Sequence, residues 1–400
     1  MTQSRWLRYP LFALLYFVQG AIVAYFTALN ALYLISFDLT MSQIGLIGTI
    51  GMIPFVLKIF LGMLSDRVNF FKLGHRKPYI VIGLVIQSIC LIIVPMIDPG
   101  KQYWLYAALA FTLMSGQALY DTCTDGLALD TTLPDEQGTV QGFMVGGRAL
   151  GVVILSAVIG LVVDAFSWRT MFYFLAGMSL LPLPLVFLLR EISRTENRKF
   201  EWKAFSAFTK FPVICLAALG ALYSFTTNGA NQIINPFIDF EFGISYSAAG
   251  LFTTMWGVGV VLGGLTGGRL VDRIGQRRAV QTAIIISFTA IAALAAIQST
   301  SLAFILVTAF GLAYGYFETV YFALSMKLTD PRIAASMFSI LMAIANIGTA
   351  ISMSVSGSLV DNIGFRMTFV VIAVINLLGF LLVRGIFGRL NQGFQPTSAK

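Results

Sequence analysis

Residues 53–67 read IPFVLKIFLGMLSDR, and this stretch decides the fold. Lys58 is the only charged residue between Asp38 and Asp66. The run is therefore long enough for a membrane-spanning helix, which needs about 20 mostly apolar residues. It ends in the pattern Gly-x-x-x-Asp-Arg, and residues 268–273, GRLVDR, repeat that pattern. A pattern that recurs at the ends of two apolar runs predicts a membrane protein built from two related halves.

The composition of the whole chain indicates many such helices. Of 400 residues, 58% are hydrophobic and 11% are charged, whereas a soluble domain carries about 25% charged residues. Uncharged runs of helix length recur, and the run over residues 279–317 is long enough for two helices. We therefore predict an all-α polytopic membrane protein with twelve transmembrane helices. The three cysteines fall within predicted helices, so we expect no disulfide framework, no metal site and no cofactor.

A long polar interruption and an internal repeat divide the chain. The longest polar segment covers residues 190–210, and GLVVDAFSWRTMF from Gly160 returns as GSLVDNIGFRMTF from Gly357, 197 residues later. The halves are thus two pseudo-symmetric six-helix bundles. We predict an N-terminal bundle over residues 1–190, a cytoplasmic linker with an amphipathic segment over 191–211, a C-terminal bundle over 212–390 and a cytoplasmic tail over 391–400.

The basic residues predict the orientation in the membrane. With twelve spans, the loops on one side hold only Lys101, Arg169 and Arg366, and the remaining lysines and arginines between spans fall on the other side. Cytoplasmic loops carry the excess of lysine and arginine, so both termini are expected in the cytoplasm. We expect a multi-pass protein of the bacterial inner membrane. The net charge of +8 then reflects this bias and anionic lipid, not nucleic acid.

The paired loops resemble a known family. Gly-x-x-x-Asp-Arg at the ends of the second and eighth predicted helices is similar to the signature loop of the major facilitator superfamily. The resemblance covers nearly the whole chain and implies that family's fold. It implies a cytoplasmic latch between the halves formed by Gly62, Asp66, Arg67, Gly268, Asp272 and Arg273. The first loop departs from the pattern, because VNFFKL separates Arg67 from the next glycine where one residue is usual.

The pattern around Lys58 narrows the resemblance. Pro54-x3-Lys58-x3-Gly62-x3-Asp66, followed by a longer loop and GHRKPY, resembles two branches of that superfamily. One contains the anhydromuropeptide permeases and acetyl-CoA transporters, and the other contains the folate–biopterin transporters. The segment DTCTDGLALDTTLPDE over residues 121–136 is similar to the region of helices 4 and 5 in both branches.

Four ionisable residues are predicted at one depth in the membrane. A helix rises about 1.5 Å per residue, so these residues are expected about 12–15 Å from the cytoplasmic boundary of the membrane. They are Lys58, Asp121, Arg148 and Glu318, on predicted helices 2, 4, 5 and 10. Each costs about 3 kcal/mol or more at the bilayer centre unless it pairs or faces water. Two interpretations remain open. They form structural salt bridges, Lys58 with Asp121 and Arg148 with Asp121 or Asp125, or they bind substrate and carry a coupling proton.

The functional interpretation assigns these residues roles. Lys58, Arg148 and Asp121 are candidate substrate ligands, and Lys58 has no counterpart in the second half, where the repeat has glycine. Glu318 has no cation near it on its own helix, and an unpaired carboxyl in a low dielectric can hold a proton near neutral pH. It is the first candidate for proton coupling, followed by Asp121 and Asp125.

Uncharged polar residues extend the candidate substrate site. The spacing of three and four residues puts the amides of predicted helix 7 on one face, and the family resemblance implies that helices 1, 4, 7 and 10 line a cavity. Interhelical hydrogen bonds are the alternative role for such amides. The candidates are Tyr25, Asn30, Asn228, Asn231 and Gln232.

These features predict a secondary active transporter rather than an enzyme. Two six-helix halves suit alternating access, the chain has no Walker sequence for ATP, and the two cations favour an anionic or amphiphilic organic solute. The Asp-x3-Asp pair at 121–125 lacks the second acidic motif of a membrane prenyltransferase. We predict proton-coupled uptake by a monomer whose partners are its solute, protons and lipid. Efflux by proton antiport, or a non-transporting pigment or assembly protein on the same fold, are the alternatives.

Overall fold

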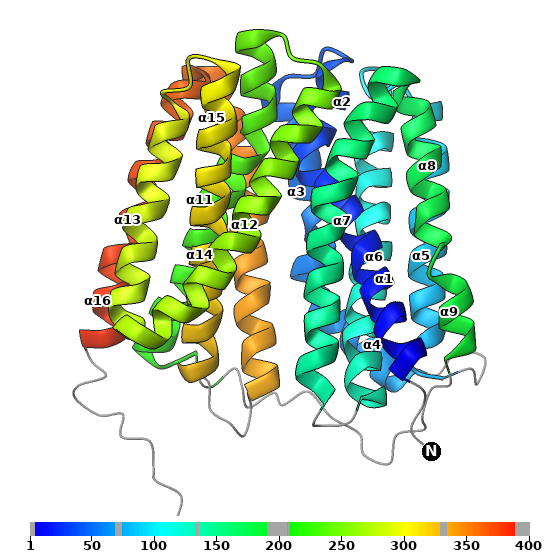
Figure 1. The fold of residues 1–400 in the computed structure, drawn as a ribbon, viewed down its shortest axis with the longest axis horizontal. Helices are drawn as coiled ribbons and strands as arrows, with labels where there is room; N and C mark the ends of the chain where they lie inside the picture. The colour runs from blue at the N-terminus through cyan, green and yellow to red at the C-terminus, as the bar shows by residue number, and fades with distance from the viewer. Residues whose placement is uncertain are drawn as a thin grey trace, which may run out of the picture.

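The computed structural model describes residues 5–68, 74–132, 136–189, 206, 208–328 and 334–388, and their regular structure is helical (Figure 1). In the N-terminal half, the first span begins as α1 (Arg5–Ala24), passes through a π-helix η1 (Tyr25–Leu29) and ends as α2 (Asn30–Ile35). The second span is α3 (Met41–Val56) and α4 (Lys58–Arg67). The other elements of this half are α5 (Lys77–Ile93), η3 (Val94–Met96), α6 (Tyr103–Thr131), α7 (Gln137–Ala165), α8 (Trp168–Leu180) and α9 (Leu183–Leu188).

The C-terminal half contains longer helices. They are α11 (Phe211–Phe242), α12 (Tyr246–Ile274), α13 (Gln276–Leu294), α14 (Thr300–Leu328), α15 (Ala334–Asn376) and α16 (Gly379–Gly388). Two helices meet inside α15 at Gly364, whose φ of 76° interrupts the helical backbone. Glycine adopts this left-handed conformation without steric strain.

The membrane-spanning character of the chain is clear from its helices. Ten of the described helices are long and apolar enough to cross a membrane. The helix α6 is not among them, but its 29 residues equal the length of α7. The last of the ten covers 52 residues and contains the break at Gly364. When α6 is added and that span is divided, the helices correspond to the twelve that the sequence predicts. The chain is an integral multi-pass membrane protein.

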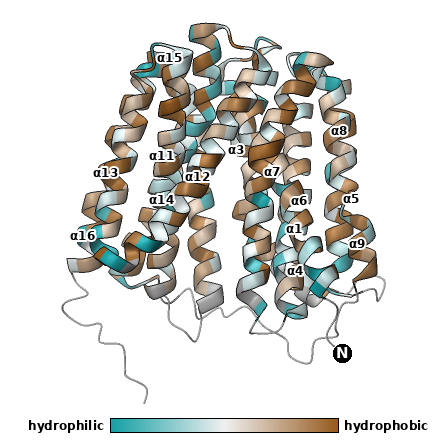
Figure 2. Ribbon diagram, viewed as in Figure 1, coloured by the Kyte–Doolittle hydropathy of each residue, from teal (hydrophilic) through white to brown (hydrophobic). Residues whose placement is uncertain are grey.

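The helices form two bundles side by side (Figure 1). The helix α1 begins and α16 ends at the lower end in Figure 1, and α2 ends and α3 begins at the upper end. Hydrophobic residues run along most of the helix surfaces, and hydrophilic residues gather near the helix ends (Figure 2). The predicted linker and tail lie almost entirely outside the described residues, as does the predicted amphipathic segment.

Two helix pairs join the bundles. The helix α3 of the first half packs along α15 of the second, and α7 packs along α12. The backbones approach closely at Gly45, where a Cβ atom would lie 2.2 Å from the carbonyl oxygen of Met353, and at Gly160, where it would lie 2.3 Å from that of Tyr246. Small residues at such positions allow membrane helices to pack tightly. The pairing repeats the internal symmetry of the sequence.

A buried arginine fixes the lower end of the N-terminal bundle. The Arg8 guanidinium has 2% of its side-chain surface exposed and lies 2.6 Å from a Glu136 carboxylate oxygen. It also donates a 2.8 Å hydrogen bond to the Thr131 carbonyl. These contacts join α1 to the last residue of α6 and to the residue just before α7.

Candidate functional site

The cation that interrupts the second span is held within its own bundle. The Lys58 ammonium group forms an ion pair with Asp121 and a second, longer one of 3.4 Å with Asp125. Asp121 also accepts a 2.7 Å hydrogen bond from the Gln19 side chain, and Asp125 accepts one from the Tyr16 hydroxyl. The structure therefore brings three of the predicted charged residues together in one network of α1, α4 and α6.

Arg148 and Glu318 are in a different situation. Arg148 lies on α7, Glu318 lies on α14, and neither has a hydrogen bond or an ion pair with another described residue. The opposite charges of Arg148 and Glu318 are near enough to attract each other, and Asp121 also attracts Arg148. Arg148 and Glu318 come from opposite bundles, and their charged atoms are more than 4.0 Å apart.

The predicted amides on α11 have partners in the C-terminal bundle. Asn228 donates to the Thr349 hydroxyl at 3.1 Å and accepts from the Tyr314 hydroxyl at 3.0 Å. Tyr314 lies one helical turn before Glu318 on α14. Gln232 donates a 3.3 Å hydrogen bond to the Met353 carbonyl. These contacts are the interhelical hydrogen bonds that membrane amides commonly make.

The predicted polar residues of the first span are buried together. The Tyr25 hydroxyl donates to the Asn30 side-chain oxygen at 2.8 Å, and the Tyr106 hydroxyl donates to the same oxygen at 2.7 Å. All three side chains are buried. They lie around the π-helix η1 and connect it to α6.

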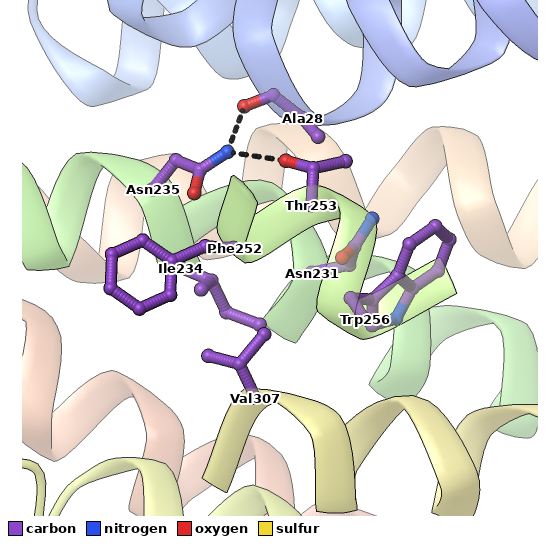
Figure 3. A pocket seen from close by; sticks show the side chains of 8 residues that line it. All are labelled: Ala28, Asn231, Ile234, Asn235, Phe252, Thr253, Trp256 and Val307. Atoms are coloured by element: carbon purple, nitrogen blue, oxygen red, sulfur yellow. Dashed lines mark hydrogen bonds between the residues drawn. The ribbon is translucent and has the colours of Figure 1, made fainter. Parts of the chain in front are cut away.

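A small cavity lies between α11 and α12, against the π-helix (Figure 3). Its volume is about 10 Å³, the space that a single water molecule needs. Asn235 donates from its amide nitrogen to the Ala28 carbonyl at 3.0 Å and to the Thr253 hydroxyl at 2.9 Å (Figure 3). The full lining is Ala28, Asn231, Ile234, Asn235, Phe252, Thr253, Trp256 and Val307. Of the residues predicted to bind substrate, Asn231 is in this cavity, which in this conformation is too small for an organic solute.

Two carboxylates join the bundles at the upper end. Asp361, on α15, accepts hydrogen bonds from the backbone amides of Met41 at 3.1 Å and Ser42 at 2.7 Å, in the first turn of α3. Asp164, on α7, accepts from the amides of Tyr246 at 3.2 Å and Ser247 at 2.7 Å, in the first turn of α12. A carboxylate at a helix N-terminus satisfies unpaired amides and the helix dipole. We call these two contacts the carboxylate clasps.

The clasps complete the capping of both helices. Thr40 accepts a hydrogen bond from the Gln43 amide at the start of α3, and Ser245 accepts one from the Ala248 amide at the start of α12. In each case a residue of the same bundle caps the third amide and an aspartate of the opposite bundle takes the first two. Sequence analysis missed the clasps, although Asp164 and Asp361 occupy equivalent positions of the repeat.

The predicted latch at the lower end is only partly described. The side chains of Asp66, Arg67 and Asp272 lie outside what the structure describes, and Arg273 is exposed. A Cβ atom at Gly62 would lie 3.2 Å from the Thr122 methyl group, and one at Gly268 would lie 3.9 Å from that of Thr319. On the second span, the hydrogen bonds that the structure describes between the bundles are made by Met41, Ser42, Thr49 and Phe55, all of which precede Lys58.

Comparison with known proteins agrees with the helical membrane architecture. The model of the Major Facilitator Superfamily matches residues 12–230 and 216–394. A folate-biopterin transporter of Synechocystis is 27% identical over 54% of this chain, a match that spans only 47% of that protein's length. The anhydromuropeptide permease of Escherichia coli is 22% identical over 90% of this chain and 77% of its own.

Solved structures agree on the architecture. A crystal structure of the nucleoside transporter NupG (D323A mutant) superimposes with a TM-score of 0.81 and 15% identity, covering 95% of this chain and 100% of that one. At this identity the likeness concerns the fold alone. With two six-helix bundles, a repeated loop pattern and a family model that matches nearly the whole length, the chain belongs to the Major Facilitator Superfamily.

Proposed function

We propose that the protein is a secondary active transporter that takes up a polar organic solute with an anionic group, driven by protons. The observation that carries this proposal is the pair Arg148 and Glu318. Two ionisable side chains at the middle of membrane spans, on opposite bundles and without partners among the described residues, are expensive to maintain unless they serve a ligand or an ion. The anionic group binds at Arg148, and Glu318 carries the proton.

The two residues give a simple coupling scheme. An ionised Glu318 attracts the guanidinium of Arg148 and competes with the solute. A proton on Glu318 removes that competition, so Arg148 can bind the anion. Lys58 is already neutralised by Asp121 and Asp125, and its role is to hold α4 against α6 at the border of the same polar layer.

The state of the molecule fits this cycle. Both termini lie on the cytoplasmic side, as the distribution of basic residues favours. The clasps then lie on the outer side of the membrane and hold the two bundles together there. The latch residues Asp66, Arg67, Asp272 and Arg273 hold the opposite, outward-open state. The monomer in the inner membrane is the transporting unit.

The relatives suggest which solutes to test first. One is named for folate and biopterin and another for anhydromuropeptides. Both are organic solutes, and both relatives are transporters by name. The first panel therefore consists of folate, biopterin and an anhydromuropeptide, the solutes that these relatives are named for.

Flux into proteoliposomes tests the proposal. Radiolabelled panel members are added outside, with and without an inward proton gradient. The wild type is expected to accumulate one of them only with the gradient, Arg148→Gln to lose binding, and Glu318→Gln to exchange solute without accumulation. Arg169→Gln, an exposed arginine outside the site, is the control. Accumulation driven by an outward gradient would instead establish efflux, and binding without flux would indicate a non-transporting protein.

A further inference from the structure

The second span is broken beside Lys58. The helix α3 ends at Val56 and α4 begins at Lys58, with Leu57 between them at φ −83° and ψ 2°. Pro54 has no amide hydrogen to give to the helix. Past the break, the amides of Phe60 and Leu61 both donate to the Leu57 carbonyl. The two parts pack differently, because α3 lies between α15 of the opposite bundle and α6 of its own, whereas α4 packs mainly against α6.

The first span is also irregular. Its backbone forms the π-helix η1 between α1 and α2, and the Asn30 amide donates to the Tyr25 carbonyl five residues earlier. A π-turn shifts the hydrogen-bond ladder by one residue, and such turns are frequent at functional sites. The two spans of the N-terminal bundle that contact α11 and α15 therefore both contain a helix defect.

An asparagine of the C-terminal bundle donates to a backbone carbonyl at each defect. Asn346, on α15, donates to the Phe55 carbonyl at 3.1 Å, two residues before the break at Leu57. Asn235, on α11, donates to the Ala28 carbonyl at 3.0 Å, inside the π-helix. A helix defect can release a carbonyl from the helix's own hydrogen-bond ladder, and such a carbonyl can accept a donor from another helix.

We infer that Asn235 and Asn346 are positioning residues that couple closure of the outer side to the two helix defects. Both donors belong to one bundle and both acceptors to the other, so the two hydrogen bonds exist only while the bundles are together. When the bundles separate, the carbonyls lose these donors and the defects lose their external support. The open and closed arrangements of the two bundles and the backbone geometry at the two defects therefore change together, as one two-state element. The inference takes its meaning from the proposed transport cycle, but the bundle equilibrium is measurable without any solute.

Pulsed electron resonance distances test the inference. Spin labels replace the exposed residues Gln102 and Gln298, one in a loop of each bundle at the upper end. The protein carries Asp361→Asn, which we expect to populate both states. The buried native cysteines are replaced by alanine: Cys90, Cys123 and Cys215.

The expected result is a shift of the open-to-closed ratio. Asn235→Ala and Asn346→Ala each raise this ratio about threefold, the effect of an average hydrogen bond between membrane helices, and together about tenfold. Asn346→Asp keeps the shape and removes the donors, so it shifts the ratio at least as far. The matched control is Asn376→Ala, because Asn376 also donates to a backbone carbonyl, that of Ile284 at 2.8 Å, but within its own bundle. It lowers the melting temperature and leaves the ratio unchanged.

Two results would overturn the inference. Distance distributions of the Asn235 and Asn346 variants that match the parent would show that these contacts do not influence closure. An equal shift with Asn376→Ala would show that the ratio responds to general destabilisation. Failure to find a transported solute would count against the proposed function and would leave this measurement intact.

Discussion

Neutralising the carboxylate clasps should open the upper end of the molecule. Asp361 and Asp164 each take two amides from the first turn of a helix in the opposite bundle. Both side chains are exposed, so the smaller values for a charge at a helix N-terminus apply. We take about 1 kcal/mol for each clasp. Replacement by asparagine keeps the shape and one acceptor oxygen but removes the charge, so each variant should change the open-to-closed ratio about fivefold, and the double variant about thirtyfold.

The spin-label pair at Gln102 and Gln298 measures this ratio directly. Asp98→Asn is the matched control, because Asp98 lies at the same end and carries the same charge but contacts Lys101 and Gly100 of its own bundle. The clasp variants should gain a long-distance population that the control lacks. High salt should also raise the open-to-closed ratio of the wild type, since salt screens exposed charges. If the double variant shows the wild-type distance distribution, the clasps do not hold the bundles together and the reasoning is wrong.

Three further predictions concern packing and buried charge. Arg8→Ala should lower the melting temperature far more than Arg5→Ala, because 2% of the Arg8 side chain is exposed against 69% for Arg5; equal losses would contradict this. Lys58→Met should lower the free energy of unfolding by roughly 3 kcal/mol, because it leaves the charge of Asp121 buried without its partner. Adding Asp121→Leu to Lys58→Met should recover most of that loss. Chemical denaturation measures both variants, and additive losses would refute the pairing. Gly45→Ala should raise the open population in the spin-label assay, since its Cβ would lie 2.2 Å from a carbonyl of the opposite bundle; an unchanged ratio would show that α3 and α15 adjust.

The sequence predicted the parts of this molecule that depend on hydrophobicity and repetition. Apolar run length predicted the spans, and Gly-x-x-x-Asp-Arg at two places predicted the paired bundles. Depth counting placed Lys58 and Asp121 in one layer, and the structure pairs them. Depth counting could not predict that Lys58 has ion-pair partners and Arg148 has none among the described residues, because the pairing depends on how each helix is rotated about its axis.

The contacts between the bundles were beyond the reach of sequence patterns for a physical reason. A carboxylate that binds backbone amides, such as Asp361 on the first turn of α3, has no partner side chain to search for. The π-helix that contains Ala28 could not be predicted from a proline or a glycine, because residues 25–29 read YFTAL. Pro54 does signal a disturbed helix, but the asparagine that uses the disturbance lies 292 positions after it, at Asn346.

The strength of these contacts matters as much as their positions. A ligand moves a two-state equilibrium from 1:99 to 99:1 only if it prefers one state by about 5.5 kcal/mol. The clasps at about 1 kcal/mol each and the two asparagines at about 0.6 kcal/mol each stay below that limit. A few buried ion pairs across the same interface would exceed it and lock the molecule. Exposed carboxylates and buried asparagines that bind the backbone therefore suit a transporter, because they specify how the bundles meet while ligand binding can still separate them.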